Sequence, residues 1–535
     1  MKFAVMSDIH YISEEMMLEQ TEPKYRLKHA VSKAALDTAA GLEDIDTILI
    51  TGDLTNDGDA ISHDELVRLL RDVKAKGKRV YVLTATHDYR FNRSYTVKHG
   101  ASVKYNATPW DLPWFDKDSF DYKTIVHDEF KQLSAEQCVP PLEKVYCPTE
   151  LWEVYREFGR DDAISVCEQA YSYCVELDKN TWCLMLNDGF RDVDAMRNTS
   201  ATYSPECYRW IESMVKQARQ KGIFIFACTH HPLVPPVPGY KIGGTDRNMR
   251  SAVICHILAD IGIPLVFSGH THFADVAFGS SDRGNILCNI TTPSACFLPP
   301  QFRTAQLDAA QGKISLRSIP VPVPEGINLT EKTLKEHYTK EFIEEYRHKI
   351  SAMKPPLNKI IMGATVKKLY PLCRGACGMT REEYMRIKGK SVFDILIAAA
   401  VNMQCGDGEF TPDTPEYKFM MGMCAFIDSI ISTQPFKDLS GKLKGYSVSQ
   451  IVEPMLFNNY IPDNDADFDF TKLPEPRVKV PELKSCGGDV LMTVLWVLAV
   501  PLSVLAPVIT AAALPVAVVK KKKRLKASPI RPERY

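Results

Sequence analysis

Short apolar runs alternate with amphipathic stretches through the first 270 residues of the chain. The runs with strand character read KFAVMS, TILIT, VYVLTAT, IFIFACT and PLVFS. Helical stretches at Lys24–Ala40 and Asp59–Lys76 separate the first three runs, and further helices are expected at Pro205–Lys221 and Arg247–Ile261. This alternation predicts an α/β fold that begins with parallel strands.

The later part of this region favours antiparallel pairing. Tyr171–Leu177 and Thr181–Asn187 are expected to be paired strands joined by a turn. Alternating runs then follow at Ala274–Phe278, Asn285–Thr291 and Lys313–Arg317, with polar turns between them. Two mixed β-sheets packed face to face and flanked by helices would fit this order.

Polar motifs stand at the ends of the apolar runs. They are Asp8-Ile9-His10, Gly52-Asp53, His87-Asp88, His230-His231-Pro232 and Gly269-His270-Thr271-His272. Side chains at strand ends gather at one edge of an open α/β sheet, where such sheets bind ligands. Carboxylates and imidazoles gathered there suit divalent transition metals such as Mn²⁺, Fe or Zn²⁺. The sequence therefore predicts a site with two such metals that cleaves phosphoesters.

The order and spacing of the motifs resemble the calcineurin-like metallophosphoesterase family, whose pattern runs D-x-H, G-D, G-N-H-D/E, H and G-H-x-H. The resemblance covers residues 1–320, implies the same two-sheet fold, and looks most like the cyclic-nucleotide phosphodiesterase branch in motif style. It implies three sets of metal ligands: Asp8, His10 and His272 for a first metal, Asp53 as the bridge, and His230 and His270 for a second metal.

The resemblance also implies a catalytic pair. His87 would be the non-ligand imidazole that protonates the leaving group, with Asp88 orienting it. A positioned general acid of this kind is typically worth about 10²–10⁴ in rate. Tyr89, Arg90 and His231 lie beside the motifs and are candidate substrate contacts.

The motif that contains His87 departs from the family pattern at two neighbouring positions. The family's second-metal Asn, just before the catalytic His, is replaced here by Thr86, and the preceding Gly by Ala85. A hydroxyl is a poorer neutral ligand than an amide oxygen. Three outcomes are open: a weaker second metal, a water or another residue in the gap, or a catalytically dead chain. Because every ionisable ligand is intact, we favour an active enzyme.

The length of the chain indicates how many domains to expect. A chain of 535 residues predicts two or three domains. We expect a metallophosphoesterase domain at 1–320 with an aromatic-rich insertion at 91–160, either a packed flank or a lid over the substrate. A mainly helical region with a linker is expected at 325–480, with helices at Leu329–Met353, Leu357–Leu372, Arg381–Gln404 and Tyr417–Ser432, and with Asp463–Asp469 as solvated linker.

The net charge and the cysteines indicate which partners and which redox compartment to expect. The formal net charge of −1 gives no basic patch for a nucleic-acid polymer, so none is expected as a partner. The fifteen cysteines lack C-x-x-C spacing and several lie in apolar runs, which favours buried thiols in a reducing compartment. Cys373 and Cys377, four apart, are interpreted as packing residues. No oligomeric state is predicted.

The C-terminus predicts contact with a membrane. Residues 490–519 contain no charged side chain and exceed the ~20 residues that a bilayer span requires. A basic tail at 520–535 follows, which favours the cytoplasmic side and anionic lipid heads. A simple tail anchor, which the length of the stretch favours, would place the basic tail outside, whereas Pro501, Pro507 and Pro515 would allow a re-entrant hairpin with both ends in the cytoplasm. With no export signal at the N-terminus, the catalytic domain is expected in the cytoplasm.

The leading hypothesis is thus a membrane-tethered hydrolase of a phosphomonoester or phosphodiester with a dinuclear metal site. An enzymatic alternative is the hydrolysis of a lipid-linked or nucleotide pyrophosphate, with membrane lipid as a partner of the C-terminus. The alternative from another class is a non-catalytic membrane scaffold in which Thr86 marks a decayed site.

Overall fold

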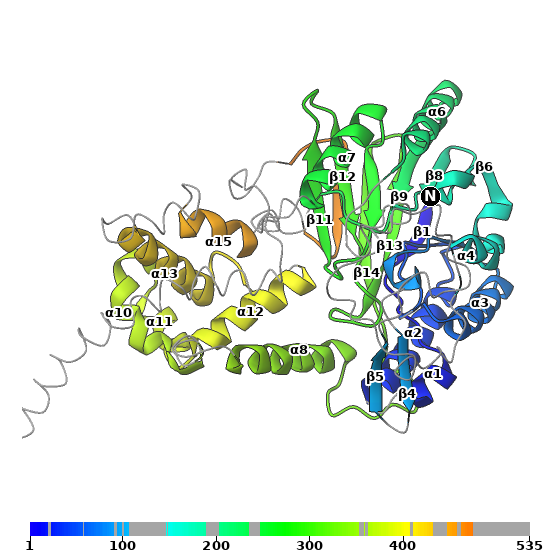
Figure 1. The fold of residues 1–535 in the computed structure, drawn as a ribbon. Helices are drawn as coiled ribbons and strands as arrows, with labels where there is room; N and C mark the ends of the chain where they lie inside the picture. Colours follow the sequence, from blue (N-terminus) through cyan, green and yellow to red (C-terminus); the bar gives the residue numbers. More distant parts are fainter. Residues whose placement is uncertain are drawn as a thin grey trace, which may run out of the picture.

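Two mixed β-sheets lie face to face in the computed structural model, with helices on their outer faces and a separate group of helices beside them (Figure 1). The structure describes residues 1–19, 23–56, 58–89, 94–98, 101–105, 146, 148–188, 203–234, 247–352, 358, 362–406, 410–431, 447–456 and 462–474. The two-sheet arrangement is the one that the sequence predicted.

The first sheet has six strands. Their spatial order is β15 (Ala466–Asp469), β14 (Lys313–Pro320), β13 (Gln301–Asp308), β1 (Lys2–Met6), β2 (Thr47–Ile50) and β3 (Arg79–Val82). The strands β1, β2 and β3 are parallel, as the β-α-β-α-β pattern predicted, and β13, β14 and β15 continue the sheet antiparallel.

The second sheet has seven strands. Their order is β11 (Asp275–Ser280), β12 (Ile286–Thr291), β10 (Leu265–Ser268), β9 (Phe224–Cys228), β8 (Thr181–Met185), β7 (Ser172–Asp178) and β6 (Ala163–Cys167). The predicted hairpin is the β7–β8 pair, and β8, β9, β10 and β12 are parallel. The carboxyl ends of the parallel strands in both sheets meet at one edge of the sandwich, where the polar motifs lie.

Apolar side chains from both sheets fill the space between them. The Phe3 ring of the first sheet lies 5.5 Å from the ring centroids of both Phe226 and Phe267 of the second. Helices α2 (Pro23–Ala40) and α3 (Ala60–Ala75) cover the outer face of the first sheet, while α6 (Pro205–Lys221) and α7 (Arg247–Ile261) cover the second. Burial between these four layers fixes the strand ends on which the site depends.

Short elements lie in the connections between these strands and helices. They are α1 (Glu14–Glu19), the 3-10 turn η1 (Thr86–Tyr89), the hairpin β4 (Ser94–Lys98) and β5 (Ala101–Tyr105), α4 (Pro148–Val154), and the 3-10 turns η3 (Arg156–Phe158), η4 (Arg160–Asp162) and η5 (Glu168–Ala170). Most of the predicted insertion, and with it the choice between a flank and a lid, lies outside the described residues.

The helices that follow the sandwich share a core of their own. They are α8 (Leu334–Ser351), α10 (Val366–Cys377), α11 (Arg381–Ile387), α12 (Val392–Cys405), α13 (Pro415–Ile431) and α15 (Val448–Leu456). The single helix expected over Arg381–Gln404 is wrong. Ser391 caps a new helix there, because its hydroxyl accepts a hydrogen bond from the Asp394 backbone N–H and the Asp394 carboxylate accepts one from the Ser391 N–H.

The predicted linker at Asp463–Asp469 is also wrong. Ala466–Asp469 forms β15 and extends the first sheet along β14, and Asp463 is buried with its carboxylate accepting the Val276 N–H at 3.1 Å. Its acidic composition suggested exposure to solvent, but Ala466 is buried and Phe468 packs against the core between the two sheets. The range 325–480 therefore contributes a strand to the sandwich.

Two further expectations concern cysteines and the membrane. None of the cysteines in the described part forms a disulfide, and Cys373 and Cys377 are buried in the helical core as predicted. Among the helices that the structure describes, none has both the length and the apolar character needed to cross a bilayer. Residues 490–519 and the basic tail lie outside the described residues.

Candidate metal centre

The side chains of the predicted ligands come from loops directly after β1, β2, β9 and β10. Asp8, His10, Asp53, His270 and His272 all have left-handed backbones, with φ between 47° and 67°. Among the described non-glycine residues, Tyr171 is the other one with a positive φ. Such a conformation costs of order 1–3 kcal/mol per residue and persists only where surrounding contacts enforce it. Its concentration at these motifs marks the strand ends as a functional site.

Two glycines allow the loops to approach one another closely. Gly52 has φ of 103°, and a Cβ there would stand 2.8 Å from His230 Nδ1 and 2.6 Å from the Ala85 side chain. A Cβ at Gly269 would overlap the Ser7 hydroxyl and the Asp8 carboxylate. The glycines of the G-D and G-H-x-H motifs are therefore required by the packing of the site itself.

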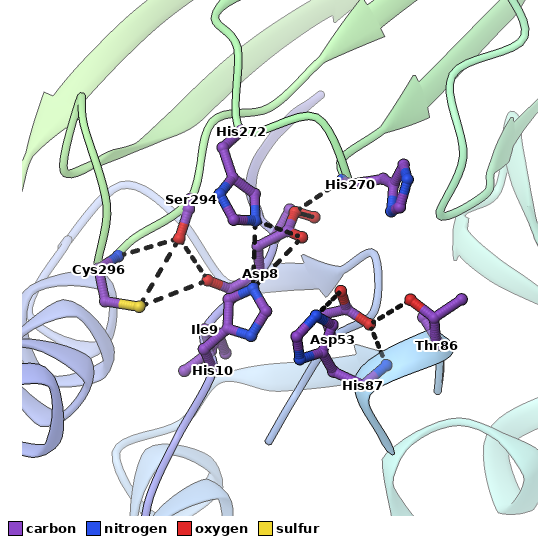
Figure 2. A network of polar contacts seen from close by, with 12 residues as sticks. Asp8, Ile9, His10, Asp53, Thr86, His87, His270, His272, Ser294 and Cys296 are labelled. Atoms are coloured by element: carbon purple, nitrogen blue, oxygen red, sulfur yellow. Dashed lines mark hydrogen bonds and ion pairs between the residues drawn. The ribbon is translucent and has the colours of Figure 1, made fainter. Parts of the chain in front are cut away.

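A first group of ligand atoms consists of Asp8 Oδ1, His10 Nε2 and His272 Nε2 (Figure 2). The two imidazole nitrogens are 3.2 Å apart, and Asp8 Oδ1 lies 3.3 Å from His272 Nε2 and 3.8 Å from His10 Nε2. The other oxygen of Asp8 accepts hydrogen bonds from the Ser7 hydroxyl and the His270 backbone N–H. This arrangement holds the carboxylate still and aims Oδ1 at the two imidazoles.

A second group consists of Asp53, His230 and His270. His230 Nε2 lies 3.3 Å from Asp53 Oδ2 and 3.2 Å from His270 Nδ1. His230 Nδ1 donates to the Thr51 carbonyl at 2.9 Å, so Nε2 is the ring nitrogen that faces the other ligands and could bind a metal in place of a proton. Asp53 belongs also to a cluster with His10 and His87, so it stands between the two groups as a bridging ligand would.

The residues fit a pair of divalent cations. Asp8 Oδ1, which faces the two imidazoles of the first group, is buried and accepts no hydrogen bond within the described residues. Burial would lower the pKa of His230, but the Asp53 and Asp8 carboxylates outweigh it and raise the pKa to about 10, so these carboxylates favour a positive charge here, either a proton or a metal cation in its place. Burial, followed by the neighbouring His231 and His230 imidazoles, holds the pKa of His270 well below its usual range. Nitrogen and oxygen lone pairs that converge in this way repel one another unless a cation lies between them.

Thr86 and His87 both contact the shared carboxylate. The His87 backbone N–H donates to Asp53 Oδ1 at 2.7 Å, and the Thr86 hydroxyl donates to the same oxygen at 3.3 Å (Figure 2). The Thr86 oxygen thus lies beside the second group, in a contact that orients Asp53. The His87 ring stands edge-on to that of His10, with centroids 4.4 Å apart, and its Nε2 is 3.9 Å from Asp53 Oδ2.

Asp88 does not hold His87 in the way that we expected. Its carboxylate accepts backbone N–H groups of Thr55 at 2.9 Å, Ala85 at 2.8 Å and Leu54 at 3.3 Å. The His87 Nδ1 contact at 2.7 Å is to the carbonyl of Asn56, so a backbone carbonyl fixes the tautomer. Burial, followed by the charge of Asp53, raises the pKa of Asp88 to about 7. Asp88 organises the loop after β2, and acts on the site through that loop.

Asp188 is a buried site residue that the motif search missed. Its carboxylate accepts three donors: His231 Nδ1 at 3.0 Å, the His231 backbone N–H at 2.8 Å and the Thr229 hydroxyl at 2.5 Å. The His231 ring lies 4.3 Å from that of His270, and its Nε2 is buried with no hydrogen-bond partner among the described residues. Asp188 stands just after strand β8, as the predicted ligands stand just after their strands, so its position at a strand end was a signal for it in the sequence.

Phe297 forms a wall beside the first group. Its ring stacks on His272 with centroids 4.8 Å apart and meets His10 edge-on at 5.3 Å. The Lys28 ammonium lies 4.2 Å from the Phe297 ring centroid and donates to Asn56 Oδ1 at 2.6 Å. No sequence motif indicated these residues. Of the predicted substrate contacts, Arg90 lies outside the described residues, the Tyr89 side chain is not described, and His231 lies beside the second group.

A fold of two packed mixed sheets with clustered His and Asp side chains at the strand ends defines a metal-dependent hydrolase class. Residues 1–274 match the family model described as calcineurin-like phosphoesterase. The chain therefore belongs to the calcineurin-like phosphoesterase family and is a phosphoric ester hydrolase. The predicted resemblance is confirmed over this range.

Three solved structures that resemble the chain are distant from it in sequence. A dimetal phosphatase from Danio rerio is 12% identical, with 60% of this chain and 96% of that chain covered and a TM-score of 0.35. A purple acid phosphatase from yellow lupin is 10% identical, with 60% and 51% covered and a TM-score of 0.32. The NAD nucleotidase of Haemophilus influenzae is 11% identical, with 62% and 49% covered and a TM-score of 0.27. No curated protein sequence matches the chain.

Proposed function

We propose that the chain hydrolyses a phosphomonoester or phosphodiester at a dinuclear site, and that it does so while tethered to a membrane. The observation that carries the dinuclear assignment is the sharing of one carboxylate. Asp53 forms one cluster with His230 and His270 and another with His10 and His87, so it adjoins both proposed groups, and within each cluster the candidate ligand atoms lie within 4.8 Å of one another. One metal would need only one of these clusters.

Asp8, His10 and His272 would hold the first metal, and Asp53, His230 and His270 the second, with Thr86 as a weak neutral neighbour. Mn²⁺, Fe or Zn²⁺ suits these mixed nitrogen and oxygen donors. When bound, two such cations supply positive charge to the phosphoryl oxygens and make an attacking water more acidic.

The remaining steps belong to side chains. His87 would donate a proton to the leaving oxygen from Nε2, because Nδ1 is engaged by the Asn56 carbonyl at 2.7 Å. Asp88 keeps the loop after β2 in place for this step by accepting three backbone N–H groups. Tyr89, Arg90 and His231 remain candidate contacts for the substrate.

The apolar stretch at 490–519 and the basic residues after it support the tether, and a re-entrant stretch would leave both these residues and the catalytic domain on the cytoplasmic side. The same stretch would bring the site close to lipid headgroups. That favours a lipid-linked phosphate or pyrophosphate as a second substrate class, beside soluble esters such as cyclic nucleotides.

The test uses the full chain purified in detergent. Metal content is measured by mass spectrometry after Mn²⁺, Fe²⁺ or Zn²⁺ loading, and hydrolysis is measured on nitrophenyl mono- and diesters, cyclic nucleotides, a nucleotide pyrophosphate and a lipid pyrophosphate in vesicles. Near two metals per chain, with hydrolysis that a chelator removes, supports the proposal. A chain without bound metal and without activity would instead be a scaffold, and a chain with a single metal would overturn the dinuclear assignment.

A further inference from the structure

The last turn of α12, far from the strand-end motifs in sequence, contacts a predicted metal ligand. Gln404 donates from its side-chain Nε2 to the His272 carbonyl at 3.0 Å and to the Leu298 carbonyl at 2.9 Å. Both partners are acceptors, so the amide must present its NH₂ group to them, and its two hydrogens serve two carbonyls. No other orientation of the amide satisfies both contacts.

One of the two carbonyls belongs to a predicted ligand of the first group, and the other belongs to the loop that packs against this ligand. His272 supplies Nε2 to that group from a left-handed backbone with φ of 61°. Leu298 follows Phe297, whose ring stacks on the His272 imidazole with an interplanar angle of 19°. One amide therefore fixes both the backbone of the ligand and the loop whose aromatic ring packs on it.

The packing around α12 keeps Gln404 in place. Cys405 is buried in the core beneath the first sheet, while Phe393 and Leu396 of the same helix are buried in the helical core. Phe273, directly after His272, packs against that helical core. Asn464 donates to the Cys405 carbonyl at 2.9 Å and accepts from Gln301 of β13 at 2.8 Å. The end of the helix is thus joined to the sandwich on more than one side.

We propose that Gln404 is a positioning residue for the first metal, so that α12, which lies beyond the family-matched residues 1–274, completes the site. The inference rests on the proposed dinuclear function. A left-handed residue is retained only where its surroundings enforce it, and at His272 the Gln404 amide is part of that enforcement. Groups that orient metal ligands in this way are commonly worth about 10–100-fold in metal affinity.

The experiment compares Gln404→Leu and Gln404→Glu with Asn402→Ala in the full chain. Leu keeps the volume and removes both donors, whereas Glu replaces the NH₂ with an oxygen that faces two carbonyls. Asn402 is the matched control, because its side-chain oxygen accepts the Phe410 N–H at 3.2 Å and so supports the helical region alone. Metal binding is followed by calorimetry, and His272→Ala identifies which binding step belongs to the first group.

We expect Gln404→Leu to weaken the step lost in His272→Ala by about 10–100-fold and to leave the other step within about threefold. Gln404→Glu should weaken it at least as much, and Asn402→Ala should leave both steps unchanged. Equal weakening by Asn402→Ala, or unchanged affinity in Gln404→Leu, would overturn the proposal.

Amide hydrogen exchange of the metal-free chains separates this inference from the proposed function. If the original chain binds no metal, the dinuclear function fails, whereas the positioning role is decided by exchange at residues 270–274. Faster exchange there in Gln404→Leu than in Asn402→Ala supports positioning by Gln404. Equal exchange in the two variants rejects it.

Discussion

The two ligand groups on either side of Asp53 are stabilised by different parts of the molecule. The first group depends on contacts from distant segments: the Ser294 hydroxyl donates to the Asp8 carbonyl at 2.6 Å, Phe297 stacks on His272, and Gln404 holds the His272 backbone. The second group is supported within the sandwich, by the Thr51 carbonyl on His230 and by the Asp188–His231 pair beside His270.

The groups differ also in their chemistry. Each ionisable ligand of the first group matches the family pattern, whereas the second has Thr86 where an amide oxygen would stand. The two groups therefore differ both in their ligand residues and in the contacts that hold these residues in place, and one difference does not follow from the other. Strand ends set which side chains meet, while the contacts that keep them rigid come from wherever the chain offers a suitable donor.

The largest effect is expected where the two groups meet. Asp53→Asn should remove metal from both groups and lower hydrolysis by about 10³-fold, because a neutral amide oxygen does not bridge two dications. Metal content and turnover are measured on the full chain beside Asp44→Asn, an exposed surface carboxylate paired with Lys2. Full metal content and near-normal turnover in Asp53→Asn would refute the bridging role.

His87→Ala tests whether the residue beside both groups is an acid and not a ligand. We expect both metals to stay bound and the rate to fall by about 10²–10⁴ on esters with alkoxide leaving groups. Nitrophenolate leaves without much help from a proton, so its ester should lose less. An equal loss on both substrates, or a loss of metal, would assign His87 to substrate positioning or to metal binding.

Asp188→Asn should affect the second group alone. Three donors converge on the Asp188 carboxylate, and an Asn side chain offers one acceptor oxygen and an NH₂ group that opposes the remaining donors. The His231 ring then loses its fixed position against His270. We expect second-metal affinity to fall by about 10-fold, within the range for groups that orient ligands, and first-metal affinity to stay unchanged.

The control for this variant is Asp178→Asn at the β7–β8 turn, where the carboxylate accepts the Asn180 N–H at 2.9 Å, away from the site. Calorimetry on both variants separates the two binding steps. An equal loss of first-metal affinity in Asp188→Asn would show that the same contacts hold both groups, and would refute their independent support.

The sequence predicted the sandwich and its ligands because strand periodicity and strand-end polar residues are local signals. Asp8, His10, Asp53, His230, His270 and His272 come together as expected. The supporting contacts were not predictable in the same way. The Asn56 carbonyl that fixes His87 is a backbone group with no residue signature, and Gln404 contacts a residue 132 positions away.

Two of the wrong expectations, those for Asp88 and for Asp463–Asp469, have a related cause. Asp88 follows His87 directly and so suggested an orienting carboxylate, but the 3-10 turn at Thr86–Tyr89 aims it at the backbone of the preceding loop. The acidic segment at Asp463–Asp469 suggested solvent, yet it pairs with β14 at the sheet edge. In both cases the residue type or the neighbouring residue in the sequence suggested a role, but the contacts are made with residues that are distant in the sequence.

The smallest expected effect is at Thr86, the one departure within the ligand pattern. Thr86→Asn replaces a hydroxyl that donates to Asp53 Oδ1 at 3.3 Å with an amide whose oxygen is a better neutral ligand. If the pocket admits the larger side chain, the metal concentration for half-maximal activity should fall by roughly fivefold, the equivalent of about 1 kcal/mol, with maximal rate unchanged. The change should appear in the second binding step and leave the first as it is.

The opposing effect is the loss of the hydroxyl contact to the shared carboxylate, since an Asn that turns toward metal no longer restrains Asp53. Thr86→Val separates the two, because it removes the donor while keeping nearly the same shape. Tighter second-metal binding in Thr86→Asn together with little change in Thr86→Val shows that the second group lacks only a ligand. Weaker binding in both variants shows that the Thr86 hydroxyl is itself the support of the second group, the counterpart of Gln404 at the first.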